Sequence, residues 1–281
     1  RQMCIRDRDN CKELGDKIDQ NIMQRRSKKD SFIIPTNLVR FNNGEGKAVI
    51  EDSVRDKDLY IISDIGNHSM TYKMYGYINH MGPDEHFMDI KSVISAVRGQ
   101  ADRVTVVMPL LYESRQHRRK GRESLDCALA LQELQNLGVS TIVTFDVHDP
   151  NIQNAVPTSM SFENFYPTNT ILKEFIKNEE FDPETVKFIS PDTGAMDRAK
   201  YYANMFQADV GMFHKRRDYS KIVDGKNPIV AHNYLGGNLE GETAIVVDDM
   251  IASGTSMLEV AVDLKKRGAR KVVLISTFSM F

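Results

Sequence analysis

The residues with the clearest chemical potential lie near the end of the chain. Two adjacent carboxylates, Asp248 and Asp249, end an apolar run that predicts a β-strand. Their oxygens are suited to accept hydrogen bonds from neighbouring sugar hydroxyls. A loop of small residues follows and leads into a helical pattern: Ala252, Ser253, Gly254, Thr255 and Ser256. Because backbone N–H groups at a helix N-terminus bind phosphate, this order of residues predicts a sugar-phosphate site.

Other polar residues follow further predicted strands, at the positions where open parallel sheets bind ligands. They form the segments 112–122, 146–153, 190–194 and 214–217. Each segment, like the two acids, also has an ordinary structural interpretation, as a solvated cationic loop, a strand end or a helix cap such as Asp192. Together they supply cations, carboxylates and an imidazole, which are the groups that magnesium-nucleotide chemistry requires.

Length, charge and hydropathy limit the function classes. With 281 residues the chain is long enough for two hydrophobic cores. The net charge of -2 provides no basic field for nucleic acid. No apolar stretch approaches the roughly 20 residues that span a bilayer. We therefore expect neither a nucleic-acid partner nor a membrane. Residues 1–8 are highly charged and lack a natural initiator, so we treat them as uninterpretable.

The cysteines indicate a reducing compartment. Cys4, Cys11 and Cys127 are odd in number and lack the spacing of metal-binding or redox motifs. Reduced thiols are typical of the cell interior, so we expect a cytoplasmic protein.

Short apolar strands alternate with helices of 3.6-residue period along the chain, which predicts a mostly parallel α/β fold. The predicted strands are residues 59–63, 104–111, 141–145, 186–190, 210–214, 229–232 and 244–247. The predicted helices are residues 87–97, 128–134, 168–177, 194–207 and the segment that buries Met257, Val260, Ala261 and Leu264. The pattern predicts two α/β units in tandem, residues 9–165 and 166–281, with the boundary near Tyr166 and Pro167.

Several short motifs occur in a fixed order between residues 35 and 281. They are Phe-Asn-Asn-Gly-Glu at 41–45, Arg-Gln at 115–116, Asp-Val-His at 146–148 with Ile-Gln at 152–153, Ser-Pro-Asp at 190–192 with Gly194, Lys-Arg-Arg at 215–217 and Asp-Asp-Met-Ile at 248–251. This order resembles the ribose-phosphate pyrophosphokinase family. Phosphoribosyltransferases of base salvage share only the last motif and usually have one domain. The resemblance implies two tandem phosphoribosyltransferase-like domains, each a mostly parallel sheet flanked by helices.

The resemblance also implies a reaction between ATP and ribose 5-phosphate. The anomeric hydroxyl of the sugar attacks the β-phosphorus of ATP and gives phosphoribosyl pyrophosphate and AMP. This reaction is an in-line transfer of a pyrophosphoryl group. Positioning, metal ions and cations should therefore supply the catalysis, with no covalent enzyme intermediate.

The first residue roles that the resemblance implies concern the reacting phosphates. Lys215 and Arg217 match the catalytic cations that stabilise the transferred group. His148 and Asp192 match the residues that hold Mg²⁺. The family's ATP-binding residues correspond in this chain to Arg115, Gln116 and His148, together with Phe41 and Glu45.

The remaining roles concern the two ends of the substrates. Phe41 and Glu45 match residues that the family offers to the adenine of a neighbouring subunit, so the resemblance implies a homo-oligomer with a shared adenine site. An ordinary hairpin turn anchored by one aromatic side chain is the alternative interpretation. Asp248 and Asp249 match the acceptors of the ribose hydroxyls, and residues 252–256 match the loop that binds the 5-phosphate.

The chain departs from the family pattern at several positions. The usual Asp after Arg-Gln is His117, and the mobile cationic loop that follows differs through Asp126. Asp149 replaces the usual Ala after the metal-binding His, and Ala252 replaces an Asp of the phosphate loop. Residues 153–156 also differ, and relatives continue for several tens of residues beyond Phe281, so we expect a truncated copy or a missing segment.

Two other functions remain open. A catalytically silent homologue that regulates a true synthetase would keep the fold, and the divergent loop favours it, whereas the retained cations and metal-binding residues oppose it. A phosphoribosyltransferase that consumes phosphoribosyl pyrophosphate would need a segment covering the base. The sequence shows no candidate for such a segment.

Overall fold

The computed structural model describes residues 2–7, 11–97, 99–156, 158–217 and 229–280. The chain divides into two compact units, Arg1–Tyr166 and Pro167–Phe281, and each unit contains its own five-stranded sheet. No helix within these ranges is long and apolar enough to cross a membrane.

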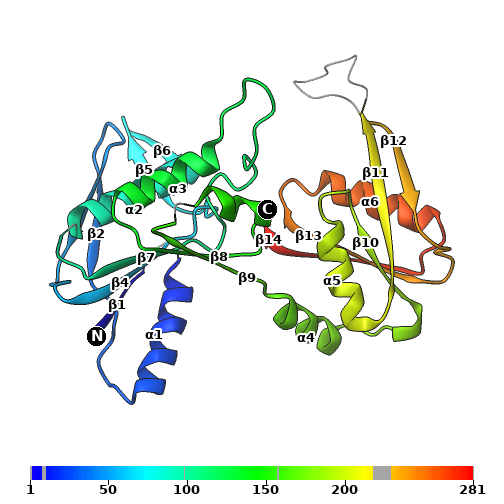
Figure 1. The fold of residues 1–281 in the computed structure, drawn as a ribbon, viewed down its shortest axis with the longest axis horizontal. Helices are drawn as coiled ribbons and strands as arrows, with labels where there is room; N and C mark the ends of the chain where they lie inside the picture. The colour runs from blue at the N-terminus through cyan, green and yellow to red at the C-terminus, as the bar shows by residue number, and fades with distance from the viewer. Residues whose placement is uncertain (1, 8–10, 98, 157, 218–228, 281) are drawn as a thin grey trace. The chain divides into compact units, whose positions relative to one another are not determined.

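The first unit is built on a parallel sheet (Figure 1). Its order is β1 (Gln2–Asp7), β4 (Lys57–Ile62), β7 (Arg103–Val107), β8 (Thr141–Phe145) and β9 (Ser161–Phe165). Every neighbouring pair of these strands is parallel. The carboxyl ends of β7 and β8 therefore lie side by side at one edge of the sheet, where ligands bind in this class of fold.

Helices cover both faces of this sheet. They are α2 (Pro83–Val97) and α3 (Asp126–Asn136) on one face and α1 (Lys12–Arg26) on the other (Figure 1). Alternate residues of β4 point to opposite faces of the sheet. Leu59 and Ile61 pack in the core with α2 and α3, whereas Ile62 packs with the residues of α1.

Two hairpins extend the first unit, and neither was predicted from the sequence as a pair of strands. They are β2 (Thr36–Arg40) with β3 (Gly46–Ile50), and β5 (Thr71–Met74) with β6 (Tyr77–His80). Tyr75 and Gly76 both have positive φ, which gives the tight turn that suits a two-residue hairpin loop. The Tyr75 backbone N–H donates to the Asn42 carbonyl at 3.0 Å, so the two hairpin turns contact each other.

The second unit has a mixed sheet. Its order is β12 (Ile229–Leu235), β11 (Asp209–Arg217), β10 (Val186–Ser190), β13 (Thr243–Ile251) and β14 (Lys271–Ser279). The pair of β11 and β12 is antiparallel, and the other pairs are parallel. The predicted strands 186–190, 210–214, 229–232 and 244–247 fall on β10, β11, β12 and β13.

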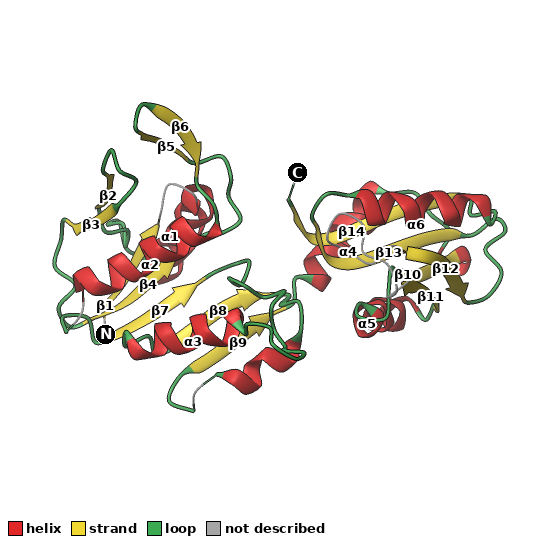
Figure 2. Cartoon of the chain, turned by 90° about the horizontal axis from the view of Figure 1, so that it is seen from above, coloured by secondary structure: helices red, strands yellow, loops and turns green. Residues whose placement is uncertain are grey.

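Helices α4 (Thr168–Asn178) and α5 (Met196–Phe206) pack on one face of the second sheet, and α6 (Thr255–Lys266) packs on the other. Figure 2 shows α6 and α5 on opposite sides of the strands. Two 3-10 turns, η2 (Pro150–Ala155) and η3 (Pro183–Thr185), complete the elements.

The structure corrects two predicted boundaries. The strand predicted at 104–111 ends at Val107. Beyond it Pro109 has no N–H for a regular ladder, and its carbonyl instead accepts a hydrogen bond from the Phe145 N–H at 3.1 Å. The helix predicted from residue 194 begins at Met196, because Asp192 Oδ1 accepts the N–H groups of Gly194 and Ala195 in a turn that precedes it.

Candidate functional site

The two acids predicted to bind sugar hydroxyls lie within a strand. The apolar run predicts them at the end of the strand, but β13 continues to Ile251 because it stays paired with β14 in register, with Asp248 opposite Ser276. The Asp249 residue is 2% exposed, and the Asp248 side chain keeps 24% of its surface in contact with solvent. The ladder therefore fixes the backbone that carries both carboxylates.

The proximity of these acids changes the ionisation of Asp248. Burial, the hydrogen bond and negative charge of Asp249, and the charge of Asp192 together raise the pKa of Asp248 to about 7. Arg198 on α5 lies nearby, with Nη1 3.8 Å from Asp248 Oδ1. Arg198 was not among the predicted site residues, since nothing in the sequence spacing links α5 to β13.

The predicted phosphate loop connects β13 to α6. Ala252, Ser253, Thr255 and Ser256 are exposed. Gly254 takes the position before α6 with a φ of 75°, and no side chain caps this helix. The first N–H groups of α6 are thus available to an anion, and two hydroxyls, those of Ser253 and Thr255, lie 3.3 Å apart beside them.

Asp192 closes a turn after β10. Its Oδ1 accepts the Gly194 N–H at 2.9 Å and the Ala195 N–H at 3.3 Å. Asp192 thus forms a turn before α5 and does not cap the helix, because Ala195 takes the N-cap position and no side chain caps it. The carboxylate has a second oxygen, which can serve a cation.

Lys215 and Arg217 lie within β11 and not in a loop after a strand, as the sequence analysis expected. Their backbone pairs with β12, with Lys215 opposite His232 and Arg217 opposite Ile229, and the register shifts between Arg216 and Arg217. The side chains of Lys215 and Arg217 lie outside the part of the chain that the structure describes.

Phe41 and Glu45 form the turn of the β2–β3 hairpin. The Phe41 N–H donates to the Glu45 carbonyl at 2.9 Å, and the Gly44 N–H donates to the Phe41 carbonyl at 2.9 Å. Phe41 is 47% exposed, so the ring does not anchor the turn by burial. A cavity of about 550 Å³ adjoins the turn and is lined by Arg40, Phe41, Gly44, Glu45, Gly46, Asp84, Glu85 and Met88.

Arg115 and Gln116 belong to the loop between β7 and α3. Arg115 is exposed. The Gln116 side-chain amide donates to the Ser124 carbonyl at 2.8 Å and to the Arg118 carbonyl at 3.4 Å. Gln116 therefore holds the two ends of this loop together.

His148 follows β8, and the divergent residues His117 and Asp149 meet beside it. His117 Nε2 lies 3.0 Å from Asp149 Oδ2, and the centres of the His117 and His148 rings are 5.4 Å apart. Burial opposes ionisation of Asp149, but hydrogen bonds from Asn151 and the charge of His117 hold its pKa below the usual range. Both residues depart from the family pattern, and nothing in their sequence spacing predicts the contact between them.

No group of three or more His, Cys, Asp or Glu side chains within the described ranges could by itself hold a metal ion. His148 belongs to the first unit and Asp192 to the second.

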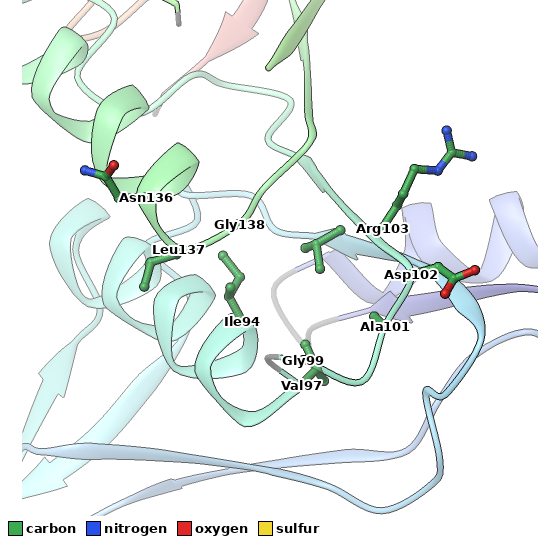
Figure 3. Close-up of a pocket in the computed structure, with 10 residues that line it drawn as sticks. Ile94, Val97, Gly99, Ala101, Asp102, Arg103, Asn136, Leu137 and Gly138 are labelled. Atoms are coloured by element: carbon green, nitrogen blue, oxygen red, sulfur yellow. The ribbon is translucent and has the colours of Figure 1, made fainter. Parts of the chain in front are cut away.

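A smaller cavity, of about 150 Å³, lies away from all of these residues. Figure 3 shows it at the start of β7 and the C-terminal ends of α2 and α3. It is lined by Ile94, Val97, Gly99, Ala101, Asp102, Arg103, Val104, Asn136, Leu137 and Gly138. The amino ends of parallel strands are not where this class of fold binds ligands, and none of the predicted site residues lines this cavity.

Comparison with known proteins gives matches in both units. Residues 3–138 match the model of the N-terminal domain of ribose phosphate pyrophosphokinase, and residues 168–279 match the phosphoribosyl transferase domain. The ribose-phosphate pyrophosphokinase of Staphylococcus saprophyticus is 28% identical over 85% of this chain and 68% of its own length. The enzyme of the same name from Vibrio cholerae is 28% identical over 86% and 70%, respectively.

A solved structure supports the fold. The phosphoribosylpyrophosphate synthetase from Mycobacterium smegmatis superposes with a TM-score of 0.79 at 20% identity, covering 100% of this chain and 82% of that one. The predicted fold class, two tandem phosphoribosyltransferase-like α/β domains, is confirmed.

Proposed function

Because the chain belongs to the ribose-phosphate pyrophosphokinase family, we propose that it transfers a pyrophosphoryl group from ATP to ribose 5-phosphate, with AMP as the second product. One structural observation carries the proposal. The acids Asp248 and Asp249 are fixed on β13, directly before an exposed loop of small residues at the uncapped start of α6. This segment combines acceptors for sugar hydroxyls with donors for a phosphate.

The substrates divide between the two units. Ribose 5-phosphate binds the second unit, with its hydroxyls on Asp248 and Asp249 and its phosphate on residues 252–256. The anomeric hydroxyl then faces the β-phosphorus of ATP. Lys215 and Arg217 stabilise the negative charge that spreads over the transferred group, since cations held in place lower the energy of such a transition state.

Mg²⁺ is the proposed metal, and its donors in this chain are His148 and Asp192. The second carboxylate oxygen of Asp192 and the imidazole of His148 are groups that this ion accepts beside phosphate oxygens and water. When bound, the ion would neutralise charge on the ATP phosphates. Arg115 contributes a further cation, whereas Gln116 reaches a nucleotide only if its amide leaves the carbonyls of Ser124 and Arg118.

The adenine site is proposed to be shared between two copies of the chain. The exposed Phe41 ring offers a stacking surface, and Glu45 beside it offers a hydrogen-bond acceptor. The active form is then at least a dimer. We also propose a cytoplasmic location, in line with the odd number of cysteines without metal or redox spacing.

Mixing two inactive variants tests the shared site. One chain carries Phe41→Ala with Glu45→Ala, and the other carries Lys215→Ala. Activity is expected to return in mixed oligomers, because some interfaces pair an unaltered hairpin with unaltered cations. Mixed oligomers without any regained activity would show that each chain uses its own hairpin or none.

The reaction itself is tested by measuring AMP release from ATP. Release that requires both ribose 5-phosphate and Mg²⁺ is the expected result. No release under these conditions, with both ligands still binding, would favour the silent regulatory homologue. Consumption of phosphoribosyl pyrophosphate with a free base would instead identify a phosphoribosyltransferase.

A further inference from the structure

Two imidazoles and a carboxylate meet at the carboxyl edge of the first sheet. His117 lies in the loop that follows β7, and His148 and Asp149 follow β8. Because β7 and β8 are neighbouring parallel strands, the segments that leave their carboxyl ends are brought together. The three side chains are thus adjacent although the loop of His117 is separated from His148 by the whole of α3.

The contact with Asp149 fixes which nitrogen of His117 carries hydrogen. His117 Nε2 lies 3.0 Å from Asp149 Oδ2, which is a hydrogen-bonding distance. An ionised carboxylate can only accept, so Nε2 is the donor. In the neutral ring the lone pair is then on Nδ1.

No residue that the structure describes forms a hydrogen bond with this second ring nitrogen. His117 Nδ1 is buried and has no hydrogen-bond partner among the residues that the structure describes. Buried polar atoms are nearly always paired, because an unpaired one loses its bond to water without compensation. The contact with Asp149 pairs Nε2 but does not explain why the polar atom Nδ1 is buried without a partner.

The position of the second ring suggests what Nδ1 binds. The ring centres of His117 and His148 are 5.4 Å apart, with the planes at 60°. Two imidazoles that bind one metal ion, each through a nitrogen at about 2.1 Å, have ring centres roughly 5 Å apart. In addition, a histidine that binds metal through one nitrogen usually donates the other N–H to a carboxylate, as His117 does to Asp149.

We propose that His117 and His148 bind one divalent metal ion together, with Asp149 orienting His117. This inference extends the metal role proposed for His148. No third His, Cys, Asp or Glu completes the cluster within the described ranges, so water or phosphate oxygens fill the other positions. Two imidazoles favour a transition metal ion such as Co²⁺ or Zn²⁺ over Mg²⁺, which prefers oxygen ligands.

Co²⁺ binding to the full chain, without nucleotide, tests this inference. Calorimetry measures the affinity, and the visible absorption of Co²⁺ reports nitrogen ligands. We expect His117→Ala to weaken Co²⁺ binding about 10-fold or more, and Asp149→Asn to weaken it about 10-fold, as the loss of an orienting carboxylate does elsewhere. His68→Ala is the control, because His68 is exposed in another loop of the same unit.

A second measurement needs no substitution in the loop. In the unaltered chain, paramagnetic Co²⁺ should shift the imidazole resonances of both His117 and His148, and those of His68 should not move. Unchanged Co²⁺ affinity in a folded His117→Ala variant, or a shift of His148 alone, would overturn the inference. The result is independent of catalysis, because Co²⁺ binding that involves both rings stands even if the chain releases no AMP.

Discussion

Four candidate functional groups of the second unit lie in strands, whereas those of the first unit lie in turns and loops. In the second unit, Asp248 and Asp249 lie within β13, which pairs with strands on both sides, and Lys215 and Arg217 lie within β11. In the first unit, the corresponding groups lie in a hairpin turn, in the loop after β7 and in the segment after β8. The chain thus combines groups held by strand ladders with groups held by loops.

This difference has a physical consequence. Ladder hydrogen bonds fix the backbone of a strand residue independently of its side-chain contacts, so the sheet holds the backbones of these four residues. A loop residue depends on a few side-chain contacts, such as the Gln116 amide with Ser124 and the His117 ring with Asp149. Loss of one such contact should therefore make the first unit's loops less well ordered, with a smaller effect on the second unit's strands.

The largest expected effect is on the chemical step. Lys215→Ala should lower kcat by about 100-fold or more, which is the usual cost of removing one group that stabilises a transition state. The ATP affinity should change far less. Lys200→Ala is a matched control, because Lys200 is exposed on α5 and forms an ion pair with the exposed Asp197. An unchanged kcat for Lys215→Ala would remove this residue from the mechanism and favour the silent homologue.

A matched pair of glycines compares the two loops. Gly254 and Gly121 both have positive φ, 75° and 69°, and at both a Cβ would meet no atom within 4 Å. A β-branched residue is strained at either position by at least about 1–2 kcal/mol, so the loop must shift. Gly254→Val should weaken ribose 5-phosphate binding about 10-fold or more by displacing the N–H groups at the start of α6. Gly121→Val should leave that binding unchanged in calorimetry.

These variants also separate a local effect from unfolding. ATP binding by Gly254→Val should stay near that of the unaltered chain. Equal losses of both ligands would mean that the substitution had disrupted the second unit as a whole.

The carboxylate pair predicts a pH dependence of stability. Burial beside Asp249 raises the pKa of Asp248 from 3.8 to about 7, so the folded chain holds a proton that the unfolded chain releases. The free energy of unfolding should therefore fall as pH rises from about 4 to about 8. Asp248→Asn should flatten this fall in urea titrations, whereas the exposed Asp197→Asn should not. Identical pH profiles for the unaltered chain and Asp248→Asn would contradict the shift.

The smallest expected effect is on the local stability of the loop between β7 and α3. Gln116→Ala removes the amide that bonds the Ser124 carbonyl, a contact worth about 0.5–1.5 kcal/mol. Trypsin should then cleave the cationic segment 117–122 roughly 2- to 10-fold faster. Gln135→Ala, which removes an exposed side-chain contact with Ser159, should leave the rate unchanged. A rate unaffected by Gln116→Ala would show that other contacts order this loop.

The strands that build the two cores were predictable from their apolar residues. Residues 141–145 and 186–190 correspond to β8 and β10 without a shift at either end. β14 was missed, although its run of residues 271–279 is mostly apolar. Helix α1 was also missed, although Ile18 and Ile22, one helical turn apart, pack partly buried against Ile62.

The hairpins and strand extensions could not be predicted in the same way. The strands β5 and β6 contribute no residue to the buried cores, so their pattern of burial has no apolar signature. The extension of β13 past the two acids depends on pairing with β14, and that of β11 through Arg217 depends on pairing with β12. From sequence alone, a polar residue after an apolar run is predicted to end the strand, because the neighbouring strand that continues the pairing is not known.

The sequence by itself determined what lies within one continuous segment. The order of strand, two acids, small residues and helix predicts a sugar-phosphate site, because neighbours along the chain keep their spacing in any fold that contains them. Only the tertiary structure decided the pairs that lie far apart in sequence, Arg198 with Asp248 and His117 with Asp149. These contacts follow from the order of strands in each sheet, which brings loop and helix ends together regardless of their separation along the chain.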